Sequence, residues 1–338
     1  MAKNIDLKTI AKDLNLTPST VSRILNGKAK EFRISEETTS LVLKYAREQG
    51  YMPNLLARGL RSSKTLTIGL MIPDISNPFF ALMARNIEKE SSKLEYSVML
   101  VDSEENTKRE QHQIRNMISR KLDGIIAAPV GGAFDHFIET TKQGIPLIFV
   151  DRYSSDLPIP FVSTDNFKGG YQATKLLIDK GHKEIGLIMG DENIEPVMER
   201  RNGYIAALAD HGIEAKNHYV VGNGFSIENG YHSTLELLNS SPMPTAIFAL
   251  SNLVGLGVLQ ALKEKNLSIP RDISLIVYDD QPYASFLNPP LTTVKQNTEK
   301  ISQLAVKYLF NLIDDRNHKI ENCKIVPDII YRESVREV

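Results

Sequence analysis

Carboxylates that directly follow apolar runs are the first residues in this chain whose type and spacing could do chemistry. The run IPLIFVD ends at Asp151, and ISLIVYDD ends at the adjacent Asp279 and Asp280. Paired carboxylates serve as general acid and base, or they accept hydrogen bonds from the hydroxyl groups of a sugar. Because no nucleophile–base constellation accompanies the pair, sugar binding explains it without a reaction.

The sequence carries no motif of the common catalytic or nucleotide-binding sites. It has no GxxxxGK[ST] loop, GxSxG elbow, HExxH pair or Cys/His metal spacing. After Met71 the chain reads IPDISNPFF, where a dinucleotide fingerprint would place glycines. His182 stands just past a predicted helix, where capping the last carbonyls is a simpler role than ligand binding. We therefore expect no enzymatic activity, no metal and no cofactor.

From Leu66 onward, short β-branched runs alternate with helical patterns. The predicted strands are 66–72, 96–102, 122–129, 145–151, 160–165, 184–190, 219–222, 245–250 and 273–280. The predicted helices are 79–93, 107–120, 134–143, 167–180, 199–211, 228–239 and 253–265. This repeated βαβ pattern predicts two α/β lobes, each a doubly wound parallel sheet. Ligands of such sheets bind outside the carboxyl ends of strands, where Asp74, Pro129, Asp151, Asp279 and Asp280 all fall.

The stretch LKTIAKDLNLTPSTVSRIL (7–25) predicts two short helices with a tight turn between them. Thr17 is placed to cap the second helix, and Pro18 takes its first position, where a missing N–H costs nothing. We expect the core face to hold Val21, Ile24 and Leu25. The outward face then holds Pro18, Ser19, Thr20, Ser22 and Arg23. This matches a helix-turn-helix that reads the DNA major groove, although a three-helix bundle with a polar surface is the alternative.

A third helix and a basic loop complete this head. Ser35 is a good N-cap, and the predicted buried stripe is Leu41, Val42 and Tyr45. The preceding loop, residues 27–34, is basic. Its candidates for phosphate contacts are Lys28, Lys30 and Arg33, although simple solvation explains them equally well.

The segment 51–65, YMPNLLARGLRSSKT, mixes apolar and basic residues. Asn54 can cap a short helix, and Gly59 makes that helix marginal. Apolar side chains flanked by arginine are typical of minor-groove binding. A plain interdomain linker is the alternative.

Charge is distributed unevenly along the 338 residues. Residues 1–64 contain twelve Lys or Arg against six Asp or Glu, a net charge of +6, so the remainder carries −7. A basic head on an acidic body is expected when a small domain binds a polyanion. The single Cys323 excludes a disulfide framework, and no apolar stretch suits a membrane span or export signal. We therefore expect a cytoplasmic protein.

Read together, these segments resemble the lactose-repressor/galactose-repressor (LacI/GalR) family of bacterial transcription regulators. The resemblance is carried by TIAKDLNLTPSTVSRILNG, YMPNLLARGL, IGLMIPDISNPFF, VDR (150–152), TDNFKGGYQATKLLIDKGHKEIGLIMG, RRNGYIAAL, VYDDQPYASFLNPPLTTVKQ and IYRESV. It spans nearly the whole chain. It implies a small all-α helix-turn-helix head and a hinge helix, joined to a periplasmic-binding-protein-like α/β body of two doubly wound lobes.

The resemblance also implies residue roles toward DNA. The expected DNA-binding positions are Lys8, Thr17, Pro18, Ser19, Thr20, Ser22, Arg23, Asn26, Arg33, Asn54, Ala57, Arg58 and Leu60. Among these, Leu60 takes the place of the leucine that wedges into the central base step, with Ala57 and Arg58 beside it. The expected target is a double-stranded, near-palindromic operator bound by a homodimer.

A second set of positions is implied for a small-molecule effector, expected to be a sugar or sugar derivative. It comprises Asn77, Phe79, Phe80, Asp151, Arg152, Arg200, Phe225, Ser251, Asn252 and Asp279. Carboxylates and guanidinium groups would hold hydroxyls, while phenylalanine rings cover the apolar face of a sugar. Family members often have Asn-Asp where this chain has Ser251-Asn252, a departure that removes one carboxylate.

The implied domain organisation is discontinuous. We expect a head at 1–50, a hinge at 51–65, a first lobe at 66–162 with 291–324, and a second lobe at 163–290 with 325–338. The function expected is that of a transcriptional repressor whose affinity for its operator is set by the effector. Two alternatives share the body: a two-lobe sugar-binding protein without a regulatory role, and an enzyme with an Asp-rich cleft. The head and the lack of a nucleophile argue against them.

Overall fold

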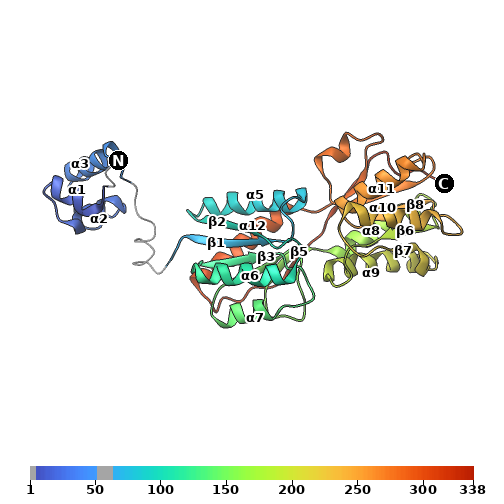
Figure 1. Ribbon diagram of the computed structural model, residues 1–338, viewed down its shortest axis with the longest axis horizontal. Helices are drawn as coiled ribbons and strands as arrows, with labels where there is room; N and C mark the ends of the chain where they lie inside the picture. The colour runs from blue at the N-terminus through green and yellow to red at the C-terminus, as the bar shows by residue number, and fades with distance from the viewer. Residues whose placement is uncertain (1–4, 52–63) are drawn as a thin grey trace. The chain divides into compact units, whose positions relative to one another are not determined.

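The computed structural model describes residues 5–51 and 64–338 (Figure 1). The chain divides into two compact units, Met1–Thr65 and Leu66–Val338. The expected hinge positions Asn54, Ala57, Arg58 and Leu60 lie outside the described residues.

The described residues of the first unit, 5–51 and 64–65, form three helices: α1 (Leu7–Asp13), α2 (Pro18–Leu25) and α3 (Glu36–Glu48). Each begins at a side-chain cap: Asp6, Thr17 and Ser35 accept hydrogen bonds from the backbone N–H three residues on. Their shared core holds Ile10, Ala11, Val21, Ile24, Val42 and Ala46. The predicted helix-turn-helix is therefore confirmed as a local structure.

Two side-chain predictions in this unit were wrong. Leu41 is 50% exposed, because the buried face of α3 follows Val42 and Ala46 one turn apart, and Leu41 lies about 100° away from it. Ser22 is only 7% exposed, although we expected it on the outward face. The Asn26 amide covers it, donating to the Ser22 carbonyl oxygen at 2.6 Å and to its hydroxyl oxygen at 3.3 Å.

The second unit contains two six-stranded sheets, which confirms the two α/β lobes that we predicted. The first sheet has the order β11-β5-β4-β3-β1-β2 and the second β12-β10-β9-β8-β6-β7. The strands of the first are β1 (Thr67–Ile72), β2 (Ser97–Asp102), β3 (Gly124–Ala127), β4 (Leu147–Val150), β5 (Phe161–Thr164) and β11 (Cys323–Ile325). Those of the second are β6 (Ile185–Ile188), β7 (Val220–Val221), β8 (Ala246–Ala249), β9 (Ser274–Tyr278), β10 (Thr292–Lys295) and β12 (Asp328–Ile330). Neighbours are parallel except β12, which runs antiparallel to β10.

Helices cover both faces of each sheet. In the first lobe these are α5 (Pro78–Ser92), α6 (Thr107–Ser119), α7 (Asp135–Lys142) and α12 (Thr298–Asp314). Figure 1 shows α5 on one side of the strands and α6 and α7 on the other. In the second lobe they are α8 (Asn166–Asp179), α9 (Glu195–Asp210), α10 (Ile227–Leu238) and α11 (Asn252–Glu264), with two 3-10 turns at Asn217–Tyr219 and Pro282–Ser285.

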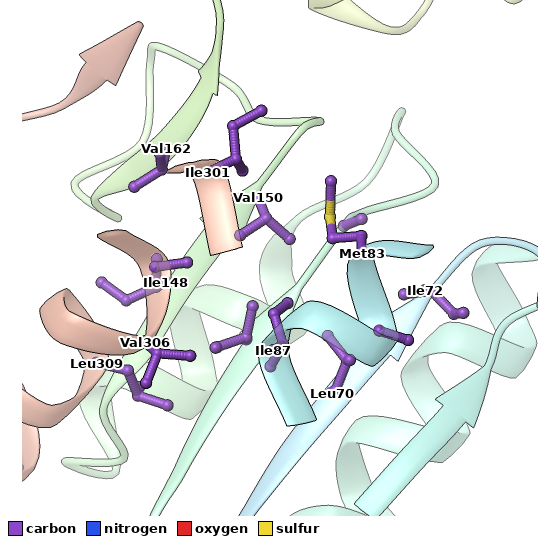
Figure 2. Packing of buried hydrophobic residues seen from close by; sticks show 14 of the residues in the cluster. Leu70, Ile72, Met83, Ile87, Ile148, Val150, Val162, Ile301, Val306 and Leu309 are labelled. Carbon is purple, nitrogen blue, oxygen red and sulfur yellow. The ribbon is translucent and has the colours of Figure 1, made fainter. Parts of the chain in front are cut away.

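The packing of the first lobe depends on a helix from the far end of the chain. Figure 2 shows Ile301, Val306 and Leu309 of α12 beside Ile148 and Val150 of β4. These side chains are almost fully buried in the cluster that α5 completes. At about 25 cal/mol per Å² of apolar surface, burial of this stripe fixes α12 on the first lobe.

The path between the lobes differs from the predicted domain boundaries. Strand β10 lies in the second sheet, although 291–324 was expected in the first lobe. Strand β10 is buried, so its backbone groups need hydrogen-bond partners on both sides. The second sheet supplies them, because β10 pairs with β9, with Thr293 opposite Val277, and with β12. Strand β5 lies wholly in the first sheet, beyond the expected boundary at residue 162, and β11 extends to Ile325. The chain therefore crosses after β5, after β10 and after β11.

Candidate ligand cleft and nucleic-acid interface

A cleft lies between the two lobes at the carboxyl ends of the strands. Nine of the ten side chains predicted for the effector line it: Asn77, Phe79, Phe80, Asp151, Arg152, Arg200, Phe225, Ser251 and Asp279. Asn252, the tenth, lies beside them, with its side chain bonded to Asn77. Four further residues that we did not predict also line the cleft: Ile194, Pro196, Val197 and Gln296.

Asp151 and Asp279 occupy equivalent positions in the two lobes. Each directly follows the third strand of its sheet, β4 or β9, counting from the C-terminal edge strand. Both have left-handed backbones, with φ of 59° and 75°. This conformation is uncommon for residues other than glycine and costs about 1 kcal/mol or more. The turn at each strand end thus directs a carboxylate into the cleft.

Asp151 is a buried carboxylate without a full set of partners. Burial raises its pKa to about 6, although the guanidinium groups of Arg200 and Arg152 act in the opposite direction. Within the described part of the chain, its Oδ1 atom has no hydrogen-bond partner. A buried acceptor of this kind is costly unless a donor reaches it. Asp151 is therefore a ready acceptor for a hydroxyl or amine of a ligand.

The side chains of Asp279 and its neighbour Asp280 have different hydrogen-bond partners. Gln296 Nε2 donates to Asp279 Oδ1 at 2.7 Å, and burial raises the pKa of the Asp279 carboxyl. Asp280 instead accepts from Arg332 and from the Thr293 hydroxyl, each at 2.8 Å. The two carboxylates do not converge, so this arrangement does not favour their acting as a general acid–base pair.

Two N–H groups of the Arg200 guanidinium donate hydrogen bonds that hold this side chain in the cleft. Its Nε donates to Asn166 Oδ1 at 2.8 Å, and its Nη1 donates to the Leu250 carbonyl at 2.7 Å. The guanidinium carbon lies 3.6 Å from the centre of the Tyr278 ring. Stacking and two hydrogen bonds together leave this charge in one orientation.

Helix α9 can bring Arg200 to the cleft because glycines let α8 approach closely. A Cβ at Gly170 would lie 2.1 Å from the Arg200 carbonyl oxygen, and one at Gly203 would lie 2.2 Å from the Phe167 carbonyl oxygen. Both distances are far inside van der Waals contact. Glycine is therefore required at both positions for the observed spacing of the two helices.

Arg152 links the two sides of the cleft. It forms a bidentate pair with Glu105, with both N–O distances at 2.7 Å. Its guanidinium carbon lies 4.6 Å from the ring centre of Phe225, which belongs to the second lobe, and 5.4 Å from that of Phe80. A Cβ at Gly190 would lie 2.4 Å from the Phe225 ring, so glycine there makes room for the ring.

The cleft is narrow in this structure. Asn252 Nδ2 donates to Asn77 Oδ1 at 2.9 Å across the lobes, and Glu195 accepts from the Ser155 N–H at 2.7 Å. The free space between the lining side chains is about 30 Å³. Because sugar-sized ligands occupy sites of roughly 300 Å³ or more, Arg152 or the lobes must move to admit one.

Two residues that the sequence drew attention to lie away from the cleft. His182 is fully buried, and its Nδ1 lies 2.8 Å from the Thr245 hydroxyl, so its ring does not cap helix carbonyls as we expected. Burial lowers the pKa of this imidazole. Asp74 accepts from the Ser76 backbone and hydroxyl in the turn before α5. Among the described residues, no group of three His, Cys, Asp or Glu side chains is placed to hold a metal ion.

The predicted DNA-binding face of the first unit is polar and largely exposed. Thr17 Oγ1 accepts from the Thr20 N–H at 3.2 Å and also bonds the hydroxyls of Ser19 and Thr20. The exposed members of the predicted set are Lys8, Thr17, Pro18, Ser19, Arg23, Asn26 and Arg33. Thr20 is half-buried, and Ser22 is not on this surface.

Comparison with known proteins assigns both units. Residues 6–54 match the family "Bacterial regulatory proteins, lacI family", and residues 65–333 match "Periplasmic binding proteins and sugar binding domain of LacI family". The chain belongs to the LacI family. It is therefore a DNA-binding transcriptional repressor, as the sequence resemblance implied.

Individual relatives of this LacI-family chain are regulators. The ribose operon repressor of Haemophilus influenzae is 32% identical over 97% of this chain and 98% of its own length. The structure of a LacI family transcriptional regulator from Enterococcus faecium with bound ribose is 32% identical, with a TM-score of 0.73 over 80% of this chain and 99% of that one. The lac repressor dimer bound to operator and the anti-inducer ONPF has the same fold, with a TM-score of 0.88 at 23% identity over 99% of this chain and 100% of that one. No helix in the described part of this LacI-family protein is long and apolar enough to cross a membrane.

Sequence reasoning missed the residues that hydrogen-bond to the charged side chains of the LacI-family cleft. Gln296, which directly follows β10, was missed because residues 291–324 were expected in the first lobe. Glu105 lies in no quoted motif, and Asn166 lies in TDNFKGG without an implied role, since the roles of both residues arise from the arginines that they contact. These partners are long-range, separated from their arginines by 47 and 34 residues.

Proposed function

We propose that this repressor binds a sugar in the cleft between its lobes and that the bound sugar sets its affinity for operator DNA. Among sugars we propose a pentose, with ribose first. The observation that carries the proposal is the convergence of Asp151, Arg152, Arg200 and Asp279 with three phenylalanine rings in one cleft.

The chemistry of the cleft supports a neutral polyhydroxylated ligand. The unpartnered Asp151 Oδ1 can accept from one hydroxyl, and charged groups form the stronger hydrogen bonds to such a ligand. Phe79, Phe80 and Phe225 offer apolar surface to the face of a sugar ring. The ribose in the structure of the Enterococcus faecium relative, and the name of the Haemophilus influenzae relative, make ribose the first candidate.

Toward DNA, we propose that α2 enters the major groove of a near-palindromic operator. Thr17, Pro18, Ser19, Thr20 and Arg23 would face the bases and the adjoining backbone, and Lys8 and Arg33 the phosphates. Ser22 would act only through the helix surface around it, since its side chain is covered. A homodimer supplies the twofold symmetry that such an operator requires. The protein would act in the bacterial cytoplasm, where its DNA target lies.

The two binding events would be coupled through segment 51–65, which we propose as the hinge. Binding of the sugar would change the arrangement of the lobes and thereby the folding of a marginal hinge helix on DNA. Such coupling is reciprocal: if ribose changes operator affinity by some factor, operator changes ribose affinity by the same factor. With the crossings seen here, the proposed first lobe comprises 66–164 and 297–325, and the second 165–296 and 326–338.

The test begins with in vitro selection of duplexes from a random library by the full-length protein. Fluorescence anisotropy then measures binding of the selected duplex with and without ribose, arabinose, glucose, ribose 5-phosphate and hypoxanthine. We expect a near-palindromic site, a steep fall of affinity with salt, and a shift caused by ribose. Calorimetry with ribose alone measures the cleft independently of DNA.

Each outcome bears on a separate part of the proposal. A shift caused by another compound of the panel would overturn the ribose assignment and keep the cleft. Ribose binding without any selected DNA site would contradict the regulatory role and favour a plain sugar-binding protein. No ribose binding and no shift by any compound would contradict the cleft as an effector site.

A further inference from the structure

The loop between α2 and α3 carries an aromatic side chain that contacts the recognition helix. The guanidinium carbon of Arg23 lies 3.9 Å from the centre of the Phe32 ring. Phe32 is 41% exposed, on the surface of the head rather than in its core. Because Phe32 is exposed and contacts an arginine of the proposed DNA-binding helix, core packing does not explain its position.

Backbone hydrogen bonds define the path of the loop that carries this ring. The Lys28 N–H donates to the Arg23 carbonyl at 2.9 Å, and the Phe32 N–H donates to the Lys28 carbonyl at 3.2 Å. Ala29 anchors the loop in the core, and its carbonyl accepts from the Ile34 N–H at 2.9 Å. The loop that leaves α2 therefore folds back and places Phe32 against Arg23 of the same helix.

The contact uses the face of the guanidinium and leaves its edge free. Stacking on a ring engages the π face, so the five N–H donors of arginine remain available for hydrogen bonds. Within the described residues Arg23 forms no ion pair, and Glu31, the carboxylate of the loop, lies 3.9 Å from Lys28 Nζ. Free donors in a fixed plane match the O6 and N7 acceptors of guanine in the major groove.

We propose that Phe32 is a specificity-determining residue that holds Arg23 in the orientation needed to read a guanine. Its ring acts through Arg23 as a positioning group. By removing rotamers of Arg23 in the free protein, it reduces the ordering cost of the specific contact. This inference rests on the proposed docking of α2 in the major groove.

The experiment measures binding of full-length variants to the duplex selected by the wild type, and to the same duplex with each G·C pair of the half-sites replaced by A·T. We expect Phe32→Ala to weaken specific binding about two- to fivefold, the range for an exposed cation–π contact. The loss should be confined to one base position, with binding to random-sequence DNA and the salt slope unchanged. Phe32→Tyr should behave as wild type, whereas Phe32→Leu should resemble Phe32→Ala because it lacks a π face.

A double-mutant cycle separates this inference from the proposed function. In an Arg23→Ala background, Phe32→Ala should add no further loss, because the ring acts through that arginine. Leu43→Ala removes another exposed apolar side chain of the same unit and serves as the control. If Arg23→Ala itself has no effect, the docking of α2 is wrong. If Arg23→Ala weakens binding and Phe32→Ala does not, or if their losses add, the positioning role of Phe32 is wrong.

Discussion

In the cleft, Asp151 combines a strained backbone, a buried carboxylate and an oxygen without a hydrogen-bond partner in the described part of the chain. Its left-handed backbone, its burial and its unpartnered Oδ1 each cost stability in the protein by itself. A ligand hydroxyl that donates to this oxygen removes one of these costs. The locally unfavourable state of Asp151 therefore supports the proposal that a ligand binds in this cleft.

We predict that Asp151 makes the protein less stable as pH rises. Its pKa in the folded chain is about 6, above the value of about 3.9 in an unfolded chain, so the folded state holds more protons between these values. The free energy of unfolding should therefore fall across this window. Asp151→Asn removes the effect and should be up to about 3 kcal/mol more stable than the wild type at pH 7.5, with no such gain near pH 4.

Urea unfolding of both proteins from pH 4 to pH 8 measures this difference. Asp279, whose pKa is also raised, is present in both proteins, and its charge repulsion with Asp151 is part of the measured difference. Parallel stability curves for the wild type and Asp151→Asn would contradict the raised pKa of Asp151.

Arg200 gives a second prediction at the residue scale. Arg200→Lys keeps the charge but loses the planar edge that bonds Asn166 and the Leu250 carbonyl. We expect ribose affinity to fall at least about tenfold, the cost of a lost charged hydrogen bond. Operator affinity without sugar should stay within about twofold of the wild type.

Calorimetry with ribose and anisotropy with the selected operator provide the two readouts. Arg201→Lys, at the next position of α9, is the matched control, because Arg201 does not line the cleft. Unchanged ribose affinity in Arg200→Lys would show that the ligand does not depend on this guanidinium.

At the scale of elements, helix spacing decides whether the arginine reaches the cleft at all. Helices α8 and α9 pack backbone against backbone through Gly170 and Gly203. The same device recurs at α10 and α11, where a Cβ at Gly230 would lie 2.2 Å from the Val254 carbonyl oxygen. Small residues at these crossings thus set how closely the helices approach and where neighbouring side chains such as Arg200 lie.

We predict that Gly170→Ala weakens both folding and ribose binding. The added methyl would lie 2.1 Å from the Arg200 carbonyl oxygen, so α9 must move and carry Arg200 with it. The expected loss of stability is about 1–3 kcal/mol, as for other overpacked sites, despite the better helix propensity of alanine. Thermal unfolding and calorimetry measure the two effects, with Gln172→Ala on the exposed side of α8 as the control. If Gly170→Ala lowers stability but leaves ribose affinity normal, the spacing of α8 and α9 does not control ribose binding.

At the scale of the whole molecule, the lobes are joined by three crossings and by contacts across the cleft. Lys324, next to the third crossing, pairs with Glu199 of α9, and Gln296, after the second, bonds both Thr164 and Asp279. A change in the cleft therefore reaches the connections between the lobes directly. This arrangement suits a body whose lobes respond together to one ligand.

We predict that Leu60→Ala separates DNA binding from sugar binding. From the family resemblance, Leu60 is expected to insert into the central base step of the operator, so truncation should weaken operator binding about tenfold or more. Ribose affinity of the free protein should be unchanged, since the cleft residues are untouched. Equal operator affinity for Leu60→Ala and the wild type would contradict the expected wedge.

Local patterns in the sequence determined most of the elements and much of the site. Helix caps at Thr17 and Ser35, the strand ends at Asp151 and Asp279, and the helical periodicity of the body depend on neighbours a few residues apart. The family resemblance then placed nine side chains in one cleft, because aligned motifs carry long-range information that periodicity lacks.

Only the tertiary structure decided which distant groups meet. It placed β10 in the second sheet, turned Asp280 toward Arg332, paired Arg152 with Glu105 and laid Phe32 on Arg23. Strand pairing and charge pairing depend on which surfaces the fold brings together, and the residues involved look alike in sequence whether they are paired or solvated. For that reason the sequence by itself determined the family, the elements and the chemistry of the cleft, whereas the crossings and the partners of each charge came from packing.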